Sequence, residues 1–226
     1  MSECTNKQLQ EIYGECSFSE VAADDDLSYE ILDKAVCYQG FFRMERYHVR
    51  HHKFSGEWSK PFTRELLERG HAAAVLPYDP EMDCVVLIEQ FRIGALKAPG
   101  GAWLLEIVAG IIDADETPQQ VVIREAVEEA GCHIAELVPL YDYLVSPGGT
   151  SEQIALFCGK TDTTKVADGT IHGLANEDED IRVHVMALSK ALTLLSSGAV
   201  KSASAIIALQ WLALNREAIR LRWSTG

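Results

Sequence analysis

Residues 110–132 constrain the fold of this chain more than any other stretch of its sequence. A glycine opens a short polar loop, and Thr117, Pro118 and Gln120 then provide a helix N-cap, a first-turn proline and a capping-box partner. Gly131 is the residue type that most often ends a helix, because it adopts left-handed backbone angles without strain. The sequence therefore predicts a loop followed by a capped helix of about three turns.

Three glutamates occupy one side of this predicted helix. Glu125, Glu128 and Glu129 are spaced i, i+3 and i+4, so their carboxylates project from one face and repel one another. A solvated acidic face is the ordinary explanation of such a run. Here the glycine-led loop, the cap, Arg124 and the glutamates occur together, and clustered hard oxygen ligands suit Mg²⁺ or Mn²⁺. We therefore expect a metal site that binds Mg²⁺, with Mn²⁺ as the alternative.

Short apolar runs separated by proline, aspartate and glycine predict an α/β domain around this helix. Before them, aromatic and β-branched residues over 29–50 indicate one or two strands, which follow a polar, acidic N-terminal segment. The sequence thus predicts an α/β fold with a small N-terminal β appendage. The expected buried strands are 72–77, 84–91, 103–110, 137–145, 153–158 and 181–186, and helices are expected at 188–197 and 202–220.

Composition and charge narrow the range of partners and compartments. The 226 residues, 47% of them hydrophobic, are enough for one domain with a small appendage. A net charge of −14 argues against nucleic acids and membranes as partners, because binding their phosphates relies on clustered Lys and Arg. The sequence has no apolar run of about 18 residues and no secretory signal pattern, so we expect a cytoplasmic protein. The six cysteines lack the spacing of a zinc site.

The stretch from Gly110 to Cys132 resembles the Nudix box, Gly-x5-Glu-x7-Arg-Glu-U-x-Glu-Glu-x-Gly-U, at every fixed position. Ala126 and Cys132 fill U positions, where bulkier aliphatic residues are usual. Over most of residues 40–222 the chain also looks like the bacterial ADP-ribose pyrophosphatase subfamily. The segments that carry this likeness are RYHVRH (46–51), ERGHAA (68–73), VVLIEQFRIGA (85–95), WLLEIVAG (103–110), SPGGTSE (146–152), IHGLANEDEDIRVHV (171–185) and ALQWL (208–212).

The resemblance implies a fold and an organisation of the chain. Residues 56–226 would form the Nudix α/β/α sandwich around a mixed sheet. Residues 1–55 would form an N-terminal segment whose strands serve a homodimer.

The resemblance also implies roles for the box residues. The backbone carbonyl of Ala109 and the carboxylates of Glu125 and Glu129 match metal ligands. Glu128 matches a neighbouring catalytic carboxylate that supports them. Arg124 is expected to brace the loop and the helix.

The acidic segment 176–180 would ordinarily be explained as a solvated loop. Its likeness to the mobile acidic loop of the subfamily implies that Glu177 is the general base and that Glu179 binds metal. Asp178 and Asp180 remain alternatives for the base, because a loop could present either carboxylate.

Substrate contacts are implied at several scattered positions. Arg92 would contact the diphosphate, Phe41 would stack on the base, and Ser146 and Glu152 would reach the terminal ribose. Each has an ordinary alternative: Arg92 as a surface arginine, Phe41 as a core residue, and the Ser-Pro-Gly-Gly segment as a simple turn. The residues matched to adenine recognition from the partner subunit are Arg64 and Glu65.

Glu106 precedes the box within the apolar run 103–110. A carboxylate buried there without a partner would be costly, so we expect it to form a salt bridge or to serve the site.

Together these features predict a Mg²⁺-dependent homodimer that hydrolyses ADP-ribose to AMP and ribose 5-phosphate. Other nucleoside diphosphate sugars, such as ADP-glucose or GDP-mannose, are close alternatives, because the Gly-rich segment 97–103 departs from the subfamily pattern. A module that binds nucleotides without cleaving them is the alternative from another class. The intact set of box glutamates argues against it.

Overall fold

The computed structural model describes residues 28–174 and 178–224, and the contacts within the chain divide it between Leu66 and Leu67 into two compact units. The boundary expected from the sequence, between residues 55 and 56, lies within the first unit.

The first unit is a three-stranded sheet in the order β1-β2-β3. Where one or two strands were expected over residues 29–50, the structure has two, β1 and β2, which pair in antiparallel fashion. The third strand was not predicted, because its sequence FTRELLE has two adjacent charged residues, Arg64 and Glu65, and no regular alternation of apolar and polar positions. The strands are β1 (Tyr29–Gln39), β2 (Arg43–His51) and β3 (Phe62–Glu68).

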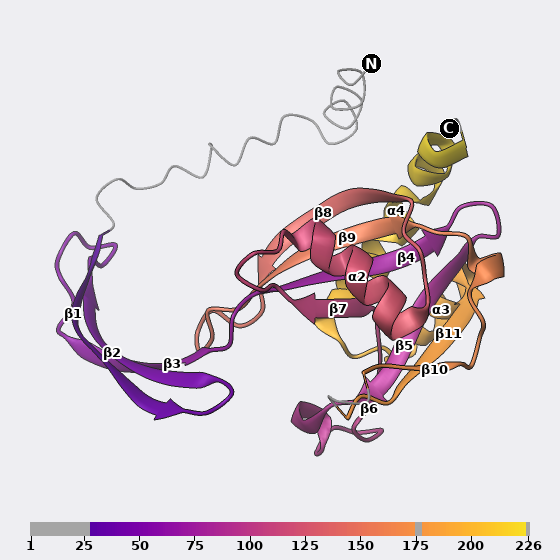
Figure 1. The fold of residues 1–226 in the computed structure, drawn as a ribbon. Coiled ribbons are helices and arrows are strands. Elements are labelled where there is room, and N and C mark those ends of the chain that lie inside the picture. The colour runs from indigo at the N-terminus through magenta and orange to yellow at the C-terminus, as the bar shows by residue number, and fades with distance from the viewer. Residues whose placement is uncertain (1–27, 175–177, 225–226) are drawn as a thin grey trace. The chain divides into compact units, whose positions relative to one another are not determined.

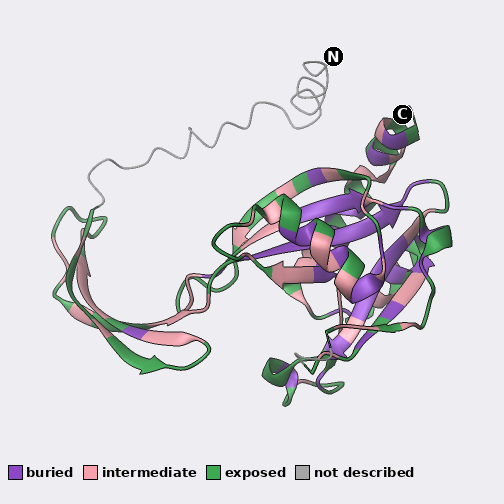
Figure 2. Ribbon diagram, in the orientation of Figure 1, coloured by how far each residue is buried: buried purple, intermediate pink, exposed green. Residues whose placement is uncertain are grey.

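Large apolar side chains of the first unit are exposed, while one of its carboxylates is buried (Figure 2). Glu45 is 2% exposed and lies 2.9 Å from Lys34 Nζ and 2.7 Å from Arg43 Nε. Tyr47 donates a third contact to it at 2.8 Å. The exposed apolar residues are Tyr29, Ile31, Leu32, Val36, Tyr38, Phe41 and Phe54.

The second unit is built on a mixed sheet in the order β10-β11-β5-β4-β9-β8, with β6 paired to β5 and β7 paired to β4 (Figure 1). β4 and β9 run parallel, and the other pairings for which a register is defined are antiparallel. The strands are β4 (Ala72–Asp79), β5 (Cys84–Phe91), β6 (Trp103–Glu106), β7 (Val108–Ile111), β8 (Glu136–Leu144), β9 (Gln153–Lys160), β10 (Ile171–His172) and β11 (Ile181–Ala187).

The apolar run 103–110, expected as one strand, forms two strands on different partners. β4 and β5 pair through Tyr78 and Asp79 at their shared turn. Farther along, β5 pairs with β6 and β4 pairs with β7, so the β6–β7 segment fills the space between the diverging strands. Ile107, at the change of partner, is 2% exposed. An unbroken apolar run carries no signal for such a change, which depends on strands distant in sequence.

Helices cover both faces of this sheet, which confirms the predicted α/β/α sandwich (Figure 1). α2 (Pro118–Ala130) packs its apolar side on one face, in a core that includes Val86 and Ile88. α3 (Leu188–Ser196) and α4 (Ala203–Ser224) cover the other face, in a core that includes Leu76 and Leu87. Within the described residues, no helix is long and apolar enough to cross a membrane.

Candidate active site

The capping signals place α2 where the sequence predicts it. Thr117 accepts a hydrogen bond from the backbone N–H of Gln120 at 3.3 Å, and the Gln120 side chain accepts from Thr117 N at 2.8 Å, which is a complete capping box. Gly131 ends the helix at φ 56°, and a Cβ there would lie 2.9 Å from Cε1 of His172. These two caps set where α2 begins and ends, and its buried apolar residues set which side faces the sheet.

Glu125 lies directly against the backbone of the box glycine. Gly110 leaves room for the carboxylate, since a Cβ at that position would overlap Oε1 of Glu125. Burial raises the pKa of Glu125, and Arg124, which donates to Oε1 at 2.8 Å, partly opposes the shift. The close approach of strand β7 and helix α2 therefore positions this carboxylate.

Arg124 braces the loop and the helix, as expected. Its guanidinium donates two hydrogen bonds of 3.0 Å to Glu116, in the loop before the helix. It also donates to Glu128 at 2.9 Å and thereby holds that side chain along the helix. Arg124 thus ties three of the acidic side chains to one cation.

Glu129 is the buried carboxylate of the site. Only 3% of the residue is exposed, and one of its oxygens accepts a hydrogen bond from Ala109 N at 3.0 Å. Burial raises the pKa of Glu129 to about 8, although the Ala109 N–H and the charge of Arg92 act in the opposite direction. The charges of Glu125 and Glu179 raise it further. Glu129 is therefore a carboxylate for which the described residues supply little positive charge.

Glu179 reaches the same group of acids from the loop before β11. Its Oε2 accepts from Leu174 N at 3.2 Å, and its own N–H donates to Leu174 O at 3.4 Å, so the two residues close the base of the loop. Gly173 is required there, because it has φ 107° and a Cβ would lie 2.7 Å from that of Glu179. Glu177, the expected general base, lies outside the described residues.

Arg92 is a basic residue of the site, and it is paired with Glu106. Arg92 Nε donates to Glu106 Oε2 at 2.7 Å, which confirms the salt bridge expected for Glu106. Arg92 follows β5, and its charge lowers the pKa of Glu129. The structure therefore brings Arg92 to the metal-ligand candidates, whereas the sequence left open a plain surface position.

The predicted ribose contacts lie around the turn before β9. Ser146 is exposed, and its carbonyl accepts hydrogen bonds of 3.0 Å from Gly149 N and Thr150 N, so the segment does form a turn. Glu152 is 6% exposed and lies 3.4 Å from Arg69 Nε. Arg69 was not predicted to lie there, because an isolated arginine carries no signal for a partner distant in sequence.

The predicted base contacts belong to the first unit. Phe41 is 86% exposed and packs edge-on against Phe42, with ring centroids 4.9 Å apart, so the alternative of a core residue is wrong. Arg64 and Glu65 are exposed on β3, and the Arg64 guanidinium lies 4.5 Å from the centroid of the Phe62 ring. All three side chains are available to a ligand or a second chain.

The residues present fit a divalent cation in their chemistry. Glu125, Glu129 and Glu179 offer hard oxygen donors and raise one another's electrostatic energy, which a bound cation would relieve. Their side chains do not converge as ligands in this conformation. Among the described residues, no three His, Cys, Asp or Glu side chains are arranged to hold a metal ion.

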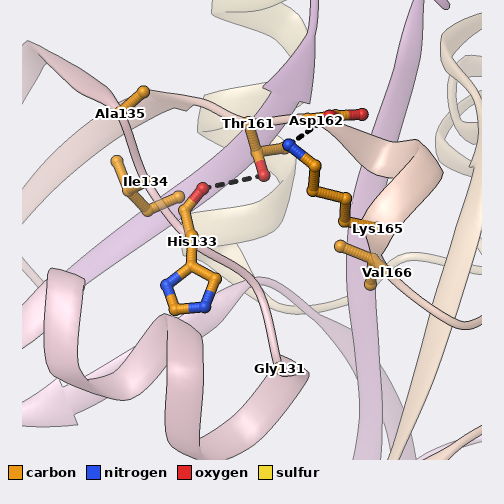
Figure 3. Close-up of a pocket in the computed structure, with 8 residues that line it drawn as sticks. All are labelled: Gly131, His133, Ile134, Ala135, Thr161, Asp162, Lys165 and Val166. Carbon is orange, nitrogen blue, oxygen red and sulfur yellow. Dashed lines mark hydrogen bonds and ion pairs between the residues drawn. The ribbon is translucent and has the colours of Figure 1, made fainter.

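A separate cavity of about 240 Å³ lies beyond the end of α2, lined by residues that include Gly131, His133 and Lys165 (Figure 3). Lys165 pairs with Asp162 at 2.9 Å, and Thr161 donates to the carbonyl of His133 at 2.9 Å. This cavity contains none of the predicted site residues.

Comparison with known proteins identifies the family. The NUDIX domain family matches residues 68–207. The chain is 46% identical over 195 residues to the ADP-ribose pyrophosphatase of Escherichia coli strain K12, covering 86% of this chain and 92% of that protein. It is 42% identical over 208 residues to the Haemophilus influenzae enzyme of the same name, covering 91% and 95%.

More distant relatives carry other names. The chain is 37% identical over 152 residues to the GDP-mannose pyrophosphatase of Cronobacter sakazakii, covering 67% of this chain and 78% of that protein. A crystal structure of an ADP compounds hydrolase shares the fold, with a TM-score of 0.62 at 19% identity, covering 83% of this chain and 96% of that one. With the box on a loop and helix of the predicted sandwich, this chain is an enzyme of the Nudix hydrolase superfamily and belongs to the subfamily of bacterial ADP-ribose pyrophosphatases.

Proposed function

We propose that the enzyme hydrolyses the diphosphate bond of ADP-ribose to give AMP and ribose 5-phosphate. The observation that carries this proposal is Glu129, a buried carboxylate beside two further acids, Glu125 and Glu179, with Arg92 close by. Such a cluster is costly in the free protein and suits a reaction in which cations and a diphosphate arrive together.

We further propose Mg²⁺ as the cation, held by Glu125, Glu129, Glu179 and the carbonyl of Ala109. When bound, it would neutralise charge on the diphosphate and lower the pKa of the attacking water. Glu128 would keep its neighbours in position through their shared partner Arg124.

Glu177 is our candidate for the general base, on its match to the acidic loop of the subfamily. The general base is expected to affect the rate of the chemical step more than substrate binding. Replacing Glu177 by Gln should therefore lower kcat by about 100-fold or more with little change in KM. An equal loss in Asp178→Asn, with Glu177→Gln active, would move the role to Asp178.

The exposed apolar side chains of β1, together with Phe41 and Phe54, support a homodimer. A single small sheet with unburied apolar faces is marginal in water, and a second copy would cover it. In this proposal Arg64 and Glu65 bind the adenine of the partner subunit's substrate, and Phe41 stacks on the base. Arg92 contacts the diphosphate, and Ser146 and Glu152 hold the terminal ribose.

The alternative substrate is another nucleoside diphosphate sugar. The likeness to GDP-mannose pyrophosphatases at 34% to 37% identity keeps GDP-mannose in question. Initial rates for ADP-ribose, ADP-glucose and GDP-mannose at equal concentrations would decide, and we expect the largest kcat/KM for ADP-ribose. A larger value for GDP-mannose would refute the proposed substrate.

The test of the proposed function is Glu125→Gln. We expect the variant to keep its fold and to lose about 1,000-fold in kcat on ADP-ribose, because a neutral amide is a poor metal ligand. Glu136→Gln is the matched control, since Glu136 is a half-exposed carboxylate whose partner is Lys160, outside the site. Full activity of Glu125→Gln would contradict the proposed metal role.

A further inference from the structure

Gln90 is a buried amide beside the candidate active site. The residue is 6% exposed, and its Nε2 has no hydrogen-bond partner among the residues that the structure describes. A buried donor without a partner costs free energy, and such groups are rare in native proteins. No pattern in the sequence pointed to a role for Gln90.

The strand geometry fixes the side on which this amide lies. Side chains alternate along a strand, and Val86 and Ile88 pack in the core beneath α2. Gln90 follows them on the same face. Arg92 continues the alternation, since its backbone is still extended at φ −128° and ψ 113°. Gln90 and Arg92 therefore face the side of the sheet that carries α2 and its glutamates.

The neighbouring strand β6 contributes Glu106, the carboxylate that pairs with Arg92. In the β5–β6 ladder Gln90 stands opposite Leu104, and Ile88 stands opposite Glu106. Glu106 is thus a diagonal neighbour of Gln90, and it binds Arg92 at 2.7 Å. The amide lies next to this ion pair.

On the other side of β5 lies β11, which directly follows the acidic loop. Arg182 pairs with Glu89, and the same antiparallel register carried one residue further sets Ile181 opposite Gln90. Glu179, which interacts with Glu129, is two residues before Ile181. Gln90 therefore stands between the Arg92–Glu106 pair and the end of the acidic loop.

We propose that Gln90 is a further substrate-binding residue, whose Nε2 donates a hydrogen bond to a non-bridging oxygen of the diphosphate beside Arg92. This inference rests on the proposed function. A neutral donor suits this position, because it binds a phosphate oxygen without adding a cation that would compete for the glutamates. The amide stays unpartnered in the free protein because its partner is the ligand.

The experiment replaces Gln90 by Met, which has nearly the same shape and no donor, and by Leu as a second apolar variant. For both we expect kcat/KM on ADP-ribose to fall about 10- to 100-fold, the range for a hydrogen bond to a charged group. The dissociation constant of ADP, measured by calorimetry with Mg²⁺, should rise by a similar factor. The melting temperature should be equal or higher by about 2–4 °C, because a desolvated donor has been removed.

Trp223→Phe is the matched control. Its Nε1 is likewise buried without a partner among the described residues, but Trp223 packs in the core on the other face of the sheet. That variant should keep kcat/KM within about twofold of the wild type. The contrast separates loss of a substrate contact from loss of any buried donor.

Two results would overturn the inference about Gln90. The first is ADP affinity and kcat/KM within about twofold of the wild type in both Gln90 variants. The second is a clear fall in melting temperature in both, which would make the amide a contributor to the fold. Failure of the proposed function looks different: the wild type would bind ADP, weakened by the Gln90 variants, yet cleave no nucleoside diphosphate sugar.

Discussion

The most deeply buried glutamate of the first unit, Glu45, and that of the second unit, Glu129, have opposite electrostatic environments. Glu45 in the first unit lies within 2.9 Å of Lys34, Arg43 and Tyr47, and the hydrogen bonds from Lys34 and Tyr47 lower its pKa. Glu129 in the second unit receives one backbone N–H, and burial raises its pKa to about 8.

The difference distinguishes a structural charge from a functional one. The charge of Glu45 is neutralised by Lys34 and Arg43 within its own sheet, so it requires no bound cation. Glu129 lacks a neighbouring cation that binds it directly in the described structure, and the residues around it are mostly acids or apolar groups. A buried carboxylate that no cation of its own chain neutralises indicates a site where a bound ligand supplies the missing positive charge.

The sharpest test of this contrast is to neutralise both carboxylates. Glu129→Gln should lower kcat on ADP-ribose by about 1,000-fold while keeping or raising the melting temperature, because a desolvated charge is removed. Glu45→Gln should do the reverse, lowering the melting temperature and sparing kcat. Differential scanning calorimetry with steady-state rates checks both. Similar effects in the two variants would break the comparison.

A second test addresses the exposed side chains of the first unit. Phe41→Ala should raise KM for ADP-ribose about 5- to 50-fold with kcat nearly unchanged, if its ring stacks on the base. Phe54→Ala is the matched control, since Phe54 is 94% exposed in the same unit and has no proposed ligand. An equal rise in both KM values would attribute the effect to the unit as a whole.

The third test concerns the state of association. Val36→Asp places a charge among the exposed apolar residues of β1 and should convert a dimer to a monomer in sedimentation equilibrium. Leu214→Asp is the control in the second unit, because Leu214 is 86% exposed on α4. A wild type that sediments as a monomer would refute the proposed dimer outright.

The smallest expected effect is in the pH dependence of stability without metal. The raised pKa of Glu129 means that its favourable contribution is present below the ordinary value of 4.5 and is lost as pH rises toward about 8. The lowered pKa of Glu45 means that its contribution is present above 4.5 and is lost as pH falls. In a chelator, Glu129→Gln should flatten only the decline in melting temperature as pH rises from 4.5 to about 8, and Glu45→Gln only the decline as pH falls below 4.5.

Local signals in the sequence predicted much of the second unit. The capping box and the box glycines located α2, because both act over a few residues. β5 has the expected bounds of 84–91, since its apolar run is short and flanked by polar residues. The division at Ile107 escaped prediction because it depends on how β4 and β5 diverge.

In the site, too, features encoded by neighbouring residues were predicted, and features that depend on distant strands were not. The spacing of Glu125, Glu128 and Glu129 predicted a shared helix face, and Arg124 was expected to brace it. The register of β5 between β6 and β11 sets the surroundings of Gln90, and no local pattern in a strand encodes its neighbours. The ion pair between Lys34 and Glu45 in the first unit could not be predicted for the same reason, since the two residues lie on different strands, β1 and β2.

Gly110 is a glycine for reasons of space, since it lies in a strand and its φ is not in the positive region that ordinarily calls for glycine. A single methyl group there would push the Glu125 carboxylate out of its present position. A homologue with every acid intact but alanine at this position could therefore fold normally and still be inactive. When related chains are sorted into active and inactive proteins, a glycine at the position of Gly110 is therefore as informative as the carboxylates themselves.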